Sequence, residues 1–321
     1  MAKKIVIALG GNATGHNHAQ QLERLKICAQ AVCDLVQQGY SIVITHGNGP
    51  QLGLVNDTIK RLAATNPKYN EIPFSARIAM TQAYIGGDLK NALMSEFSRR
   101  GIEKHVASVF TRVEVDEKDP AFENPTKPIG EFMTQDEAKA LSQSIGVCVM
   151  EDAGRGYRTV VPSPRPVKIK QFSEIQSHLA DGEIVITCGG GGLPVIRQSE
   201  GFKEVYAVID KDYVSALLAQ NLAADCLLIL TGIDCVTINY RTPNEKPLHN
   251  ISVDEAKRYI DAGQFAPGSM LPKMEAAVQF ARSKSGRQTI ITSLDKLSLA
   301  MLGKAGTIIS NQSLAKGRFK P

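Results

Sequence analysis

The sequence contains no tryptophan, and aromatic residues make up only 6% of its 321 residues. Its lysines and arginines are scattered, and a net charge of +5 with a pI near 8.8 is only mildly basic. Proteins that bind nucleic acid gather basic residues on one face and interleave them with aromatic side chains. The composition therefore argues against nucleic-acid binding, and the small positive excess is compatible with an anionic small-molecule substrate.

The six cysteines show neither zinc-type nor disulfide-type spacing. None forms a C-x-x-C pair, and most lie in apolar runs, which is typical of buried free thiols in a reducing compartment. The apolar stretch near the first residue is too short for a signal peptide. No run approaches the ~20 apolar residues of a membrane span. The sequence thus predicts a cytoplasmic protein with no membrane partner.

Several catalytic and nucleotide-binding motifs are also missing. There is no G-x-x-x-x-G-K-[ST], which excludes a P-loop enzyme, and no G-x-G-x-x-G that opens a helix after a strand. The zinc-protease motif H-E-x-x-H and the hydrolase motif G-x-S-x-G do not occur either. If the chain binds a nucleotide, it does so through a different arrangement.

The patterns that are present indicate an α/β protein. Residues 5–9 and 41–45 have the character of buried strands, and residues 18–38 repeat apolar positions at helical spacing. Strand, helix and strand in this order predict a parallel pair joined by a right-handed crossover. A second α/β region follows residue 165, with expected strands near 184–187, 226–230, 289–292 and 306–309 and expected helices near 212–222 and 271–284.

Residues 117–165 differ from both regions. They are rich in proline, carry mixed charges and contain only short apolar runs. This composition predicts an insertion or small subdomain of the kind that serves as a lid. Residues 311–321 read as a loosely held tail.

Three expected strands end in glycine-rich turns, at Gly10-Gly11-Asn12, Gly47-Asn48-Gly49 and Gly189 to Gly192. Ligands of open parallel sheets bind outside the carboxyl ends of the strands, and glycine lets backbone N–H groups approach an anion. A single such turn is explained well enough by chain reversal alone. Three of them at one sheet edge favour phosphate binding, helped by helix N-termini.

Three lysines stand in unusual settings. Lys127 is flanked by prolines, Lys211 lies between Asp210 and Asp212 at the end of an apolar strand, and Lys273 lies at an expected helix start. Phosphoryl transfer asks mainly for positioning and charge neutralisation, which mobile ammonium groups supply. A solvated surface lysine is the default interpretation of each one, and the sequence alone does not show that the three converge.

Seven segments, in order, carry a family resemblance: residues 8–12, 46–51, 124–130, 151–158, 189–192, 207–212 and 268–273. Together they closely resemble the carbamate kinases, a family with the amino-acid kinase fold, from about residue 3 to 310. The resemblance implies a three-layer α/β/α sandwich with an open, mainly parallel eight-stranded central sheet and a small protruding subdomain. It implies one amino-acid kinase domain over 1–321, with an acceptor-side lobe at about 1–165 that includes the subdomain at about 117–165, and a nucleotide-side lobe at about 166–310.

The resemblance further implies a homodimer that catalyses ATP + carbamate ⇌ ADP + carbamoyl phosphate with Mg²⁺, making ATP in the breakdown of arginine, agmatine or purine derivatives. By the same motifs, the catalytic residues would be Lys127, Lys211, Asp212 and Lys273. The transferring phosphoryl group and carbamate would be bound by Gly10, Gly11, Asn12, Gly47, Asn48 and Gly49. The nucleotide would be bound by Gly190, Gly191, Asp210, Thr231, Asp234, Val236, Tyr240 and Met270, and no residue is assigned as a metal ligand.

The chain departs from the family pattern at Ala83, where glycine is usual, and at Gly87, where an aromatic residue is usual. These departures bear on substrate fit or dimer packing. Two alternatives stay open: a relative acting on another carboxylate, such as acetylglutamate or aspartate, and a catalytically weak paralogue that binds nucleotide or carbamoyl phosphate.

Overall fold

The computed structural model describes residues 2–11, 17–66, 68, 72–145, 147–152 and 154–311. Asn12, an expected phosphate ligand, and all of the expected tail except Asn311 lie outside the described residues. The helices are α1 (His18–Gln37), α2 (Gly49–Thr65), α3 (Phe74–Arg100), α4 (Gln135–Ile145), α5 (Phe172–Ala180), α6 (Lys211–Asn221), α7 (Val253–Asp261), α8 (Met270–Arg282) and α9 (Leu297–Met301), with 3-10 turns η3 (Pro120–Phe122), η4 (Gly189–Gly191) and η5 (Leu294–Lys296).

The main sheet has eight strands in the order β15-β17-β16-β12-β1-β2-β9-β3. They are β1 (Lys4–Leu9), β2 (Ser41–His46), β3 (Val106–Ser108), β9 (Ile184–Ile186), β12 (Cys226–Thr231), β15 (Asn250–Ser252), β16 (Gln288–Ser293) and β17 (Thr307–Ser310). All neighbours pair parallel except β16 with β17. The prediction of an open, mainly parallel eight-stranded sheet is therefore confirmed.

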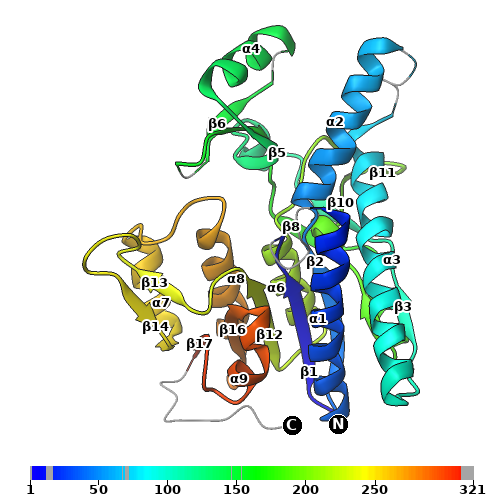
Figure 1. The fold of residues 1–321 in the computed structure, drawn as a ribbon, viewed down its shortest axis with the longest axis vertical. Helices are drawn as coiled ribbons and strands as arrows, with labels where there is room; N and C mark the ends of the chain where they lie inside the picture. Colours follow the sequence, from blue (N-terminus) through cyan, green and yellow to red (C-terminus); the bar gives the residue numbers. More distant parts are fainter. Residues whose placement is uncertain are drawn as a thin grey trace.

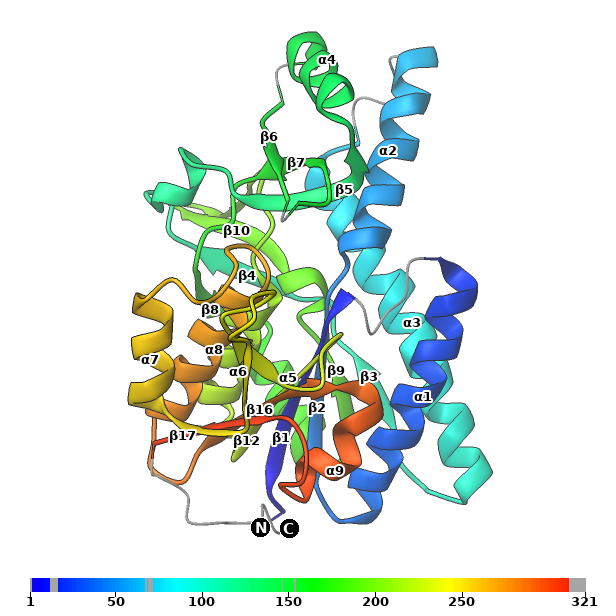
Figure 2. The same cartoon turned by 60° about the vertical axis from the view of Figure 1, so that its left-hand side comes forward.

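Helices cover both faces of this sheet, as Figures 1 and 2 show. Successive residues of a strand point to opposite faces. Ile5, Ile7 and Leu9 accordingly pack with α1, α3 and α9, whereas Val6 and Ala8 pack with α6 and α8. All five residues are buried, and an apolar strand buried on both faces is expected where helices lie on each side. The three-layer α/β/α architecture is confirmed.

The helix limits follow from local capping. Asn17 caps α1 by accepting a hydrogen bond from the N–H of Gln20 at 2.9 Å, and Ser252 forms a capping box with Glu255 at the start of α7. At the other end of α3, Gly101 adopts the left-handed conformation that commonly closes a helix. The expected helix at 18–38 thus matches α1 within one residue.

Smaller sheets lie beside the main one and were not foreseen. One has the order β11-β10-β4-β8, another pairs β13 with β14, and a third has the order β5-β7-β6. Their strands are β4 (Arg112–Val115), β5 (Lys127–Met133), β6 (Val149–Glu151), β7 (Tyr157–Val161), β8 (Pro166–Ile169), β10 (Leu193–Gln198), β11 (Gly201–Glu204), β13 (Val236–Ile238) and β14 (Lys246–Leu248).

The sheet β5-β7-β6 and helix α4 form the subdomain, which rises beside α2 above the main sheet (Figures 1 and 2). It occupies residues 127–161, inside the region set apart by its composition.

Among the described helices, none is both long and apolar enough to cross a bilayer.

One expected strand is wrong. The apolar residues before Asp210 are not a strand, and Lys211 is the first residue of α6 rather than a strand end. Val208 instead packs into a small apolar cluster with Leu52 and Ile129 below the subdomain. The positions beside β1 are taken by β2 and β12, so this segment is buried by packing without joining the main sheet.

Candidate functional site

The carboxyl ends of the central strands bring the glycine turns together. Gly10 donates a backbone hydrogen bond to Leu230 at 2.8 Å, and Gly47 donates one to Leu9 at 2.8 Å. A Cβ atom on Gly47 would lie 3.3 Å from the backbone nitrogen of Gly11. The first two turns therefore touch one another at the same sheet edge.

The third turn packs directly on the second. Gly190 has a φ of +63°, and a Cβ on it would lie 2.2 Å from the side-chain nitrogen of Asn48. Asn48 is the N-cap of α2, but its side chain donates to Thr81 at 2.8 Å instead of capping the helix. The amino end of α2 therefore keeps backbone N–H groups without a side-chain cap, which is an arrangement suited to an anion.

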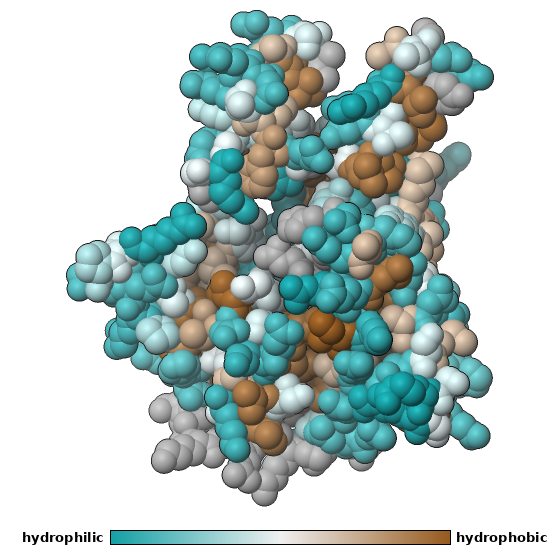
Figure 3. Space-filling view, in the orientation of Figure 1, coloured by the Kyte–Doolittle hydropathy of each residue, from teal (hydrophilic) through white to brown (hydrophobic). Residues whose placement is uncertain are grey.

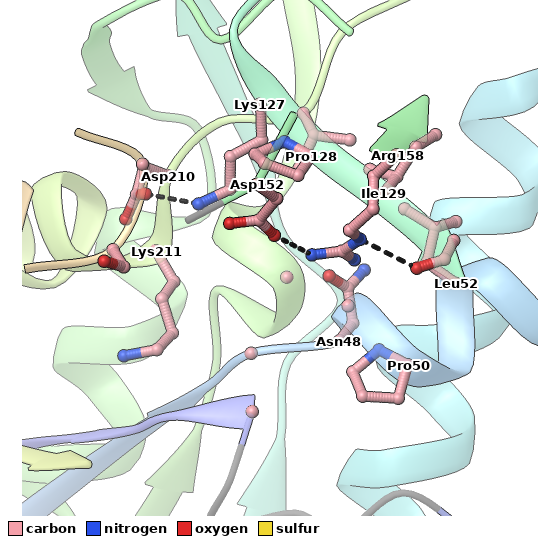
Figure 4. Close-up of a pocket in the computed structure, with 18 of the residues that line it drawn as sticks. Asn48, Pro50, Leu52, Lys127, Pro128, Ile129, Asp152, Arg158, Asp210 and Lys211 are labelled. Carbon is pink, nitrogen blue, oxygen red and sulfur yellow. Dashed lines mark hydrogen bonds and ion pairs between the residues drawn. The ribbon is translucent and has the colours of Figure 1, made fainter. Parts of the chain in front are cut away.

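A cavity of about 750 Å³ opens above these turns. Figure 3 shows the surface hollowed between the subdomain and α2, and Figure 4 shows the side chains that surround the hollow. Its lining includes Gly11, Gly47, Asn48, Gly49, Lys127, Gly190, Asp210, Lys211, Asp212 and Lys273. Gly10 lies just behind it, hydrogen-bonded to β12.

Two of the expected lysines meet on one carboxylate. Lys211 Nζ donates to Asp212 Oδ1 at 2.7 Å, and Lys273 Nζ donates to Asp212 Oδ2 at 3.0 Å. The side chain of Asp212 is only 2% exposed. The carboxylate thereby fixes both ammonium groups, one from the start of α6 and one from the first turn of α8.

The third lysine reaches the same place from the subdomain. Lys127, on β5, forms an ion pair with Asp210, and Asp210 also accepts a hydrogen bond from the N–H of Asp212 at 2.9 Å (Figure 4). Three ammonium groups from three segments of the chain therefore gather around two neighbouring aspartates. Asp210 contacts Lys127, while Asp212 contacts the other two lysines.

Burial and charge shift the acid–base behaviour of this cluster. Burial alone would raise the pKa of Asp212, but Lys211 and Lys273 outweigh it and hold that pKa well below its ordinary value. Burial lowers the pKa of Lys211. For Lys273, burial acts downward, but the two aspartates raise the pKa. Ionised pairing is thus favoured for Asp212 and Lys273.

A buried histidine supports the second glycine turn from below. His46 is 1% exposed, and its Nδ1 contacts the carbonyl of Gly47 at 3.0 Å. Burial lowers the pKa of His46 to about 4, with a further lowering from Lys211 against the opposing hydrogen bond to Gly47. The ring is therefore uncharged at neutral pH and adds no charge beneath the cluster.

Sequence reasoning missed a charged group on the subdomain wall. Arg158 donates from Nη1 to Asp152 at 3.1 Å and from Nε to the carbonyl of Gly130 at 3.0 Å. Figure 4 shows its guanidinium group above Asn48, directed into the cavity. Asp152 also pairs with Arg155. The available signal was a stretch of seven residues, 152–158, that holds one aspartate, two arginines and two glycines. No role was assigned to the charged residues of this stretch.

Several expected nucleotide-binding residues do not line this cavity: Gly191, Thr231, Asp234, Val236, Tyr240 and Met270. Asp234 accepts a hydrogen bond from the Ser293 hydroxyl at 2.6 Å, and Val236 is fully buried. Tyr240 is 59% exposed. Thr231 ends β12, Asp234 and Val236 follow it, and Tyr240 lies just after β13. Gly191 belongs to η4, and Met270 is the first residue of α8.

The two departures from the family pattern also lie apart from the cluster. Ala83 is exposed on α3 and lines a separate hollow of about 150 Å³ that also contains His46 and Phe110. A Cβ on Gly87 would meet no atom within 4 Å. Neither residue lines the main cavity, so the departures do not alter its charged groups.

No group of three or more His, Cys, Asp and Glu side chains suited to a metal ion occurs within the described ranges. Both oxygens of Asp212 already accept from lysines. Mg²⁺ in nucleotide-dependent enzymes commonly keeps several waters and binds through one or two carboxylates plus phosphate oxygens. The cavity therefore fits a Mg²⁺ ion that enters with a nucleotide better than one held in a protein cage.

Comparisons with known proteins point to one family. The family model for the amino acid kinase family matches residues 3–293. The chain is 50% identical to the carbamate kinase-like protein YqeA of Escherichia coli (strain K12), over 96% of this chain and 99% of that protein. It is 47% identical to carbamate kinase 3 of Staphylococcus aureus (strain USA300), with the same coverage of each chain. Among solved structures, carbamate kinase from Giardia lamblia bound to AMP-PNP is similar with a TM-score of 0.85, 39% identity, and coverage of 96% of this chain and 98% of that one.

Proposed function

Since this chain belongs to the amino acid kinase family, we propose that it is a carbamate kinase, which transfers a phosphoryl group reversibly between ATP and carbamate. The observation that carries the proposal is the single carboxylate, Asp212, that holds Lys211 and Lys273 beside the glycine turns. That arrangement presents two fixed ammonium groups, together with the amino end of α2, which has no side-chain cap, to one small volume. Such a volume suits a transferring phosphoryl group, whose charge must be neutralised on several oxygens.

The chemistry needs no general base. Carbamate already carries its nucleophilic oxygen as an anion, so the obstacle is its repulsion from the phosphates. In the forward direction the carbamate oxygen bonds to the γ-phosphorus while the bond to the ADP oxygen breaks. Lys211 and Lys273 neutralise the β- and γ-phosphate oxygens, and preorganised charges of this kind act strongly in a dry site.

The acceptor is bound on the opposite side of the phosphoryl group. Carbamate and the transferring group are assigned to the turns that contain Gly10, Gly11, Gly47 and Gly49 and to the side chain of Asn48. The backbone N–H groups of Gly10 and Gly47 anchor these turns to Leu230 and Leu9 and do not donate to the ligand. Lys127 exchanges its contact with Asp210 for the carbamoyl end of the substrate. The subdomain that carries Lys127 also shields the mixed anhydride from water.

The nucleotide extends from the cluster toward the carboxyl end of β12. Gly190, Gly191 and Asp210 are the proposed contacts near the phosphates. Thr231, Asp234, Val236, Tyr240 and Met270 are the proposed contacts near the base and sugar. Mg²⁺, carried on the nucleotide, would neutralise phosphate charge, and Asp210 is the carboxylate proposed to contact it.

We further propose a cytoplasmic homodimer that works toward ATP synthesis in the breakdown of arginine, agmatine or purine derivatives. The dimer is supported by Met80, Ala83 and Met94, which are exposed on α3 beside the edge strand β3. Light scattering at micromolar concentration tests it. A mass of one chain, 34.7 kDa, would contradict the dimer without affecting the proposed reaction.

An acceptor panel tests the proposed function against its alternatives. Purified protein with MgATP is given carbamate (formed from bicarbonate and ammonia), acetylglutamate or aspartate, and ADP release is measured. Of the three acceptors, only carbamate should stimulate ADP release. Stimulation by either of the other carboxylates would favour a different amino acid kinase activity, and no stimulation by any acceptor, with MgADP still binding, would favour a catalytically weak paralogue.

A further inference from the structure

Three side chains form a clamp at the base of the subdomain: Arg165, Tyr213 and Glu275. The guanidinium carbon of Arg165 lies 3.5 Å from the centre of the Tyr213 ring, and its Nη2 lies 2.6 Å from Glu275 Oε2. The Tyr213 hydroxyl donates to the same oxygen. Burial and the Glu275 carboxylate raise the pKa of Tyr213, so its hydroxyl keeps its proton and remains a donor. Each member of the clamp therefore contacts the other two.

The clamp is built on the helices that carry the charged cluster. Tyr213 directly follows Asp212 at the start of α6, and Glu275 lies two residues after Lys273 in α8. Arg165, by contrast, lies in the connection between β7 and β8, by which the chain leaves the subdomain. Its backbone N–H also donates to Asp119, at the point where the chain enters the subdomain, at 2.8 Å. Arg165 thus joins both connections of the subdomain to α6 and α8.

A stiff connector leads from Arg165 back to Lys127. The sequence from 161 to 166 is Val-Pro-Ser-Pro-Arg-Pro, and proline fixes φ near −65° at every second position. Extended chain of this type spans about 3.1 Å per residue, so Val161 lies about 12 Å from Arg165 along the connector. Val161 is the Cα partner of Lys127 in the β5–β7 pair, and the carbonyl of Pro162 accepts from Val208 at 2.9 Å.

We propose that Arg165 is a positioning residue for phosphoryl transfer, which sets where Lys127 lies relative to Lys211 and Lys273 by clamping the subdomain to α6 and α8. This inference rests on the proposed function for its kinetic consequence. The structural consequence, which is the ordering of β5, is independent of the proposed function, because the clamp orders β5 whatever the acceptor is. The two can therefore be tested separately.

The experiment compares wild type with Arg165→Ala, Arg165→Lys and Tyr213→Phe by steady-state kinetics and hydrogen–deuterium exchange. In Arg165→Ala, kcat for ATP formation from MgADP and carbamoyl phosphate should fall about 10- to 100-fold, the size of effect that a misplacement near 1 Å produces. The KM for MgADP should stay within about twofold, because Lys211 and Lys273 keep their partner Asp212. Amides of residues 127–133 should exchange faster, with no change in the central strands.

The other two variants separate the contacts of the clamp. Tyr213→Phe keeps the ring under Arg165, so its kcat should fall less than that of Arg165→Ala. Arg165→Lys keeps a charge for Glu275 but lacks the planar group that stacks on the ring, so it should recover only part of the loss. The matched control is Arg197→Ala, which removes an exposed arginine that pairs with Glu114 and lies 5.6 Å from the Phe202 ring, away from α6 and α8.

Unchanged exchange at residues 127–133 in Arg165→Ala overturns the inference, whatever the activity of the wild type. So does a loss of MgADP binding or faster exchange throughout the sheet, because either would show a general structural role. An inactive wild type with the expected local exchange change would contradict the proposed function while supporting the clamp.

Discussion

Lys273 donates a hydrogen bond to Asp212 across 3.0 Å, and this contact joins two helix starts that are 61 residues apart in the sequence. Lys211 occupies the other oxygen of the same carboxylate. Asp212 therefore has two functions in this account. It neutralises two buried cations in the folded protein, and it fixes the positions from which they act on phosphate oxygens.

Replacing Asp212 by asparagine should destabilise the protein. Two ammonium groups would remain close together without their carboxylate, and breaking a buried ion pair from one side typically costs about 3–5 kcal/mol. We expect the free energy of unfolding in urea at pH 7 to fall by about 3 kcal/mol. Asp261→Asn is the control, since Asp261 pairs with Lys257 at a site that is 59% exposed, and it should change stability by less than about 0.5 kcal/mol. Equal effects of the two substitutions would refute the assignment.

Replacing Lys211 by alanine should slow phosphoryl transfer far more than it weakens nucleotide binding. Loss of one preorganised charge contact to a transition state typically costs about 3 kcal/mol, which corresponds to a rate about 150-fold lower. Initial rates of ATP formation measure this, with thermal melting to confirm a folded protein. Lys257→Ala, on the exposed surface of α7, should retain the wild-type rate. Near-normal turnover by Lys211→Ala would show that this lysine is only a structural charge.

The contact between Gly53 and Gly130 should tolerate no side chain. A Cβ on Gly53 would lie 2.8 Å from Cα of Gly130, so α2 and the subdomain strand β5 approach each other too closely for alanine. Gly53→Ala should therefore displace β5 and lower kcat by about 10-fold or more.

Gly87→Ala provides the matched control for Gly53→Ala. It also replaces a helical glycine but meets no atom within 4 Å, so it should raise stability by about 0.5–1 kcal/mol at unchanged kcat. Similar kinetics for the two variants would show that the packing of α2 against β5 does not position the subdomain.

The stability of the protein should depend on pH through His46. Its folded-state pKa of about 4 lies below the ordinary value of 6.5, so the unfolded chain binds the proton more readily. The contribution of uncharged His46 to the free energy of unfolding is therefore complete above pH 6.5 and is lost as the pH falls toward 4. Between pH 7 and pH 5 the loss amounts to about 2 kcal/mol.

Urea unfolding of wild type and His46→Gln at pH 8, 7 and 5 tests this. The amide carries no titrating proton, so the decline between pH 7 and pH 5 should be about 2 kcal/mol smaller in the variant. The comparison at pH 8 measures the packing cost of the substitution separately. An identical decline in both proteins would mean that His46 is not buried in its uncharged form.

The sequence predicted the central layers well because their signals are local. Residues 5–9 form an unbroken apolar run between Lys4 and Gly10, and such a run is typical of a strand buried on both faces. The sheet β11-β10-β4-β8 was missed because its strands are short and some pair across long separations in the sequence, as Val195 of β10 does with Glu114 of β4. Such pairing depends on tertiary packing, which the strand propensities of single residues do not reveal.

The sequence was enough to select candidate residues for the site but not the contacts between them. Glycine turns and unusual lysines could be identified from residue type and neighbours. That Lys127 contacts Asp210, 83 residues away, follows from where the subdomain lies and has no local signal. The apolar residues before Asp210 were read as a strand because burial produces the same pattern whether or not a strand forms.

Phosphorus NMR of the wild-type protein with MgADP and carbamoyl phosphate tests the central claim most directly, since it follows donor and product in one sample. The account predicts that the carbamoyl phosphate signal decreases while the γ-phosphate signal of ATP increases by the same amount, at a rate that Lys211→Ala reduces about 150-fold. Loss of carbamoyl phosphate only at its rate of hydrolysis without protein, with no γ-phosphate signal from a folded sample that binds MgADP, would contradict it.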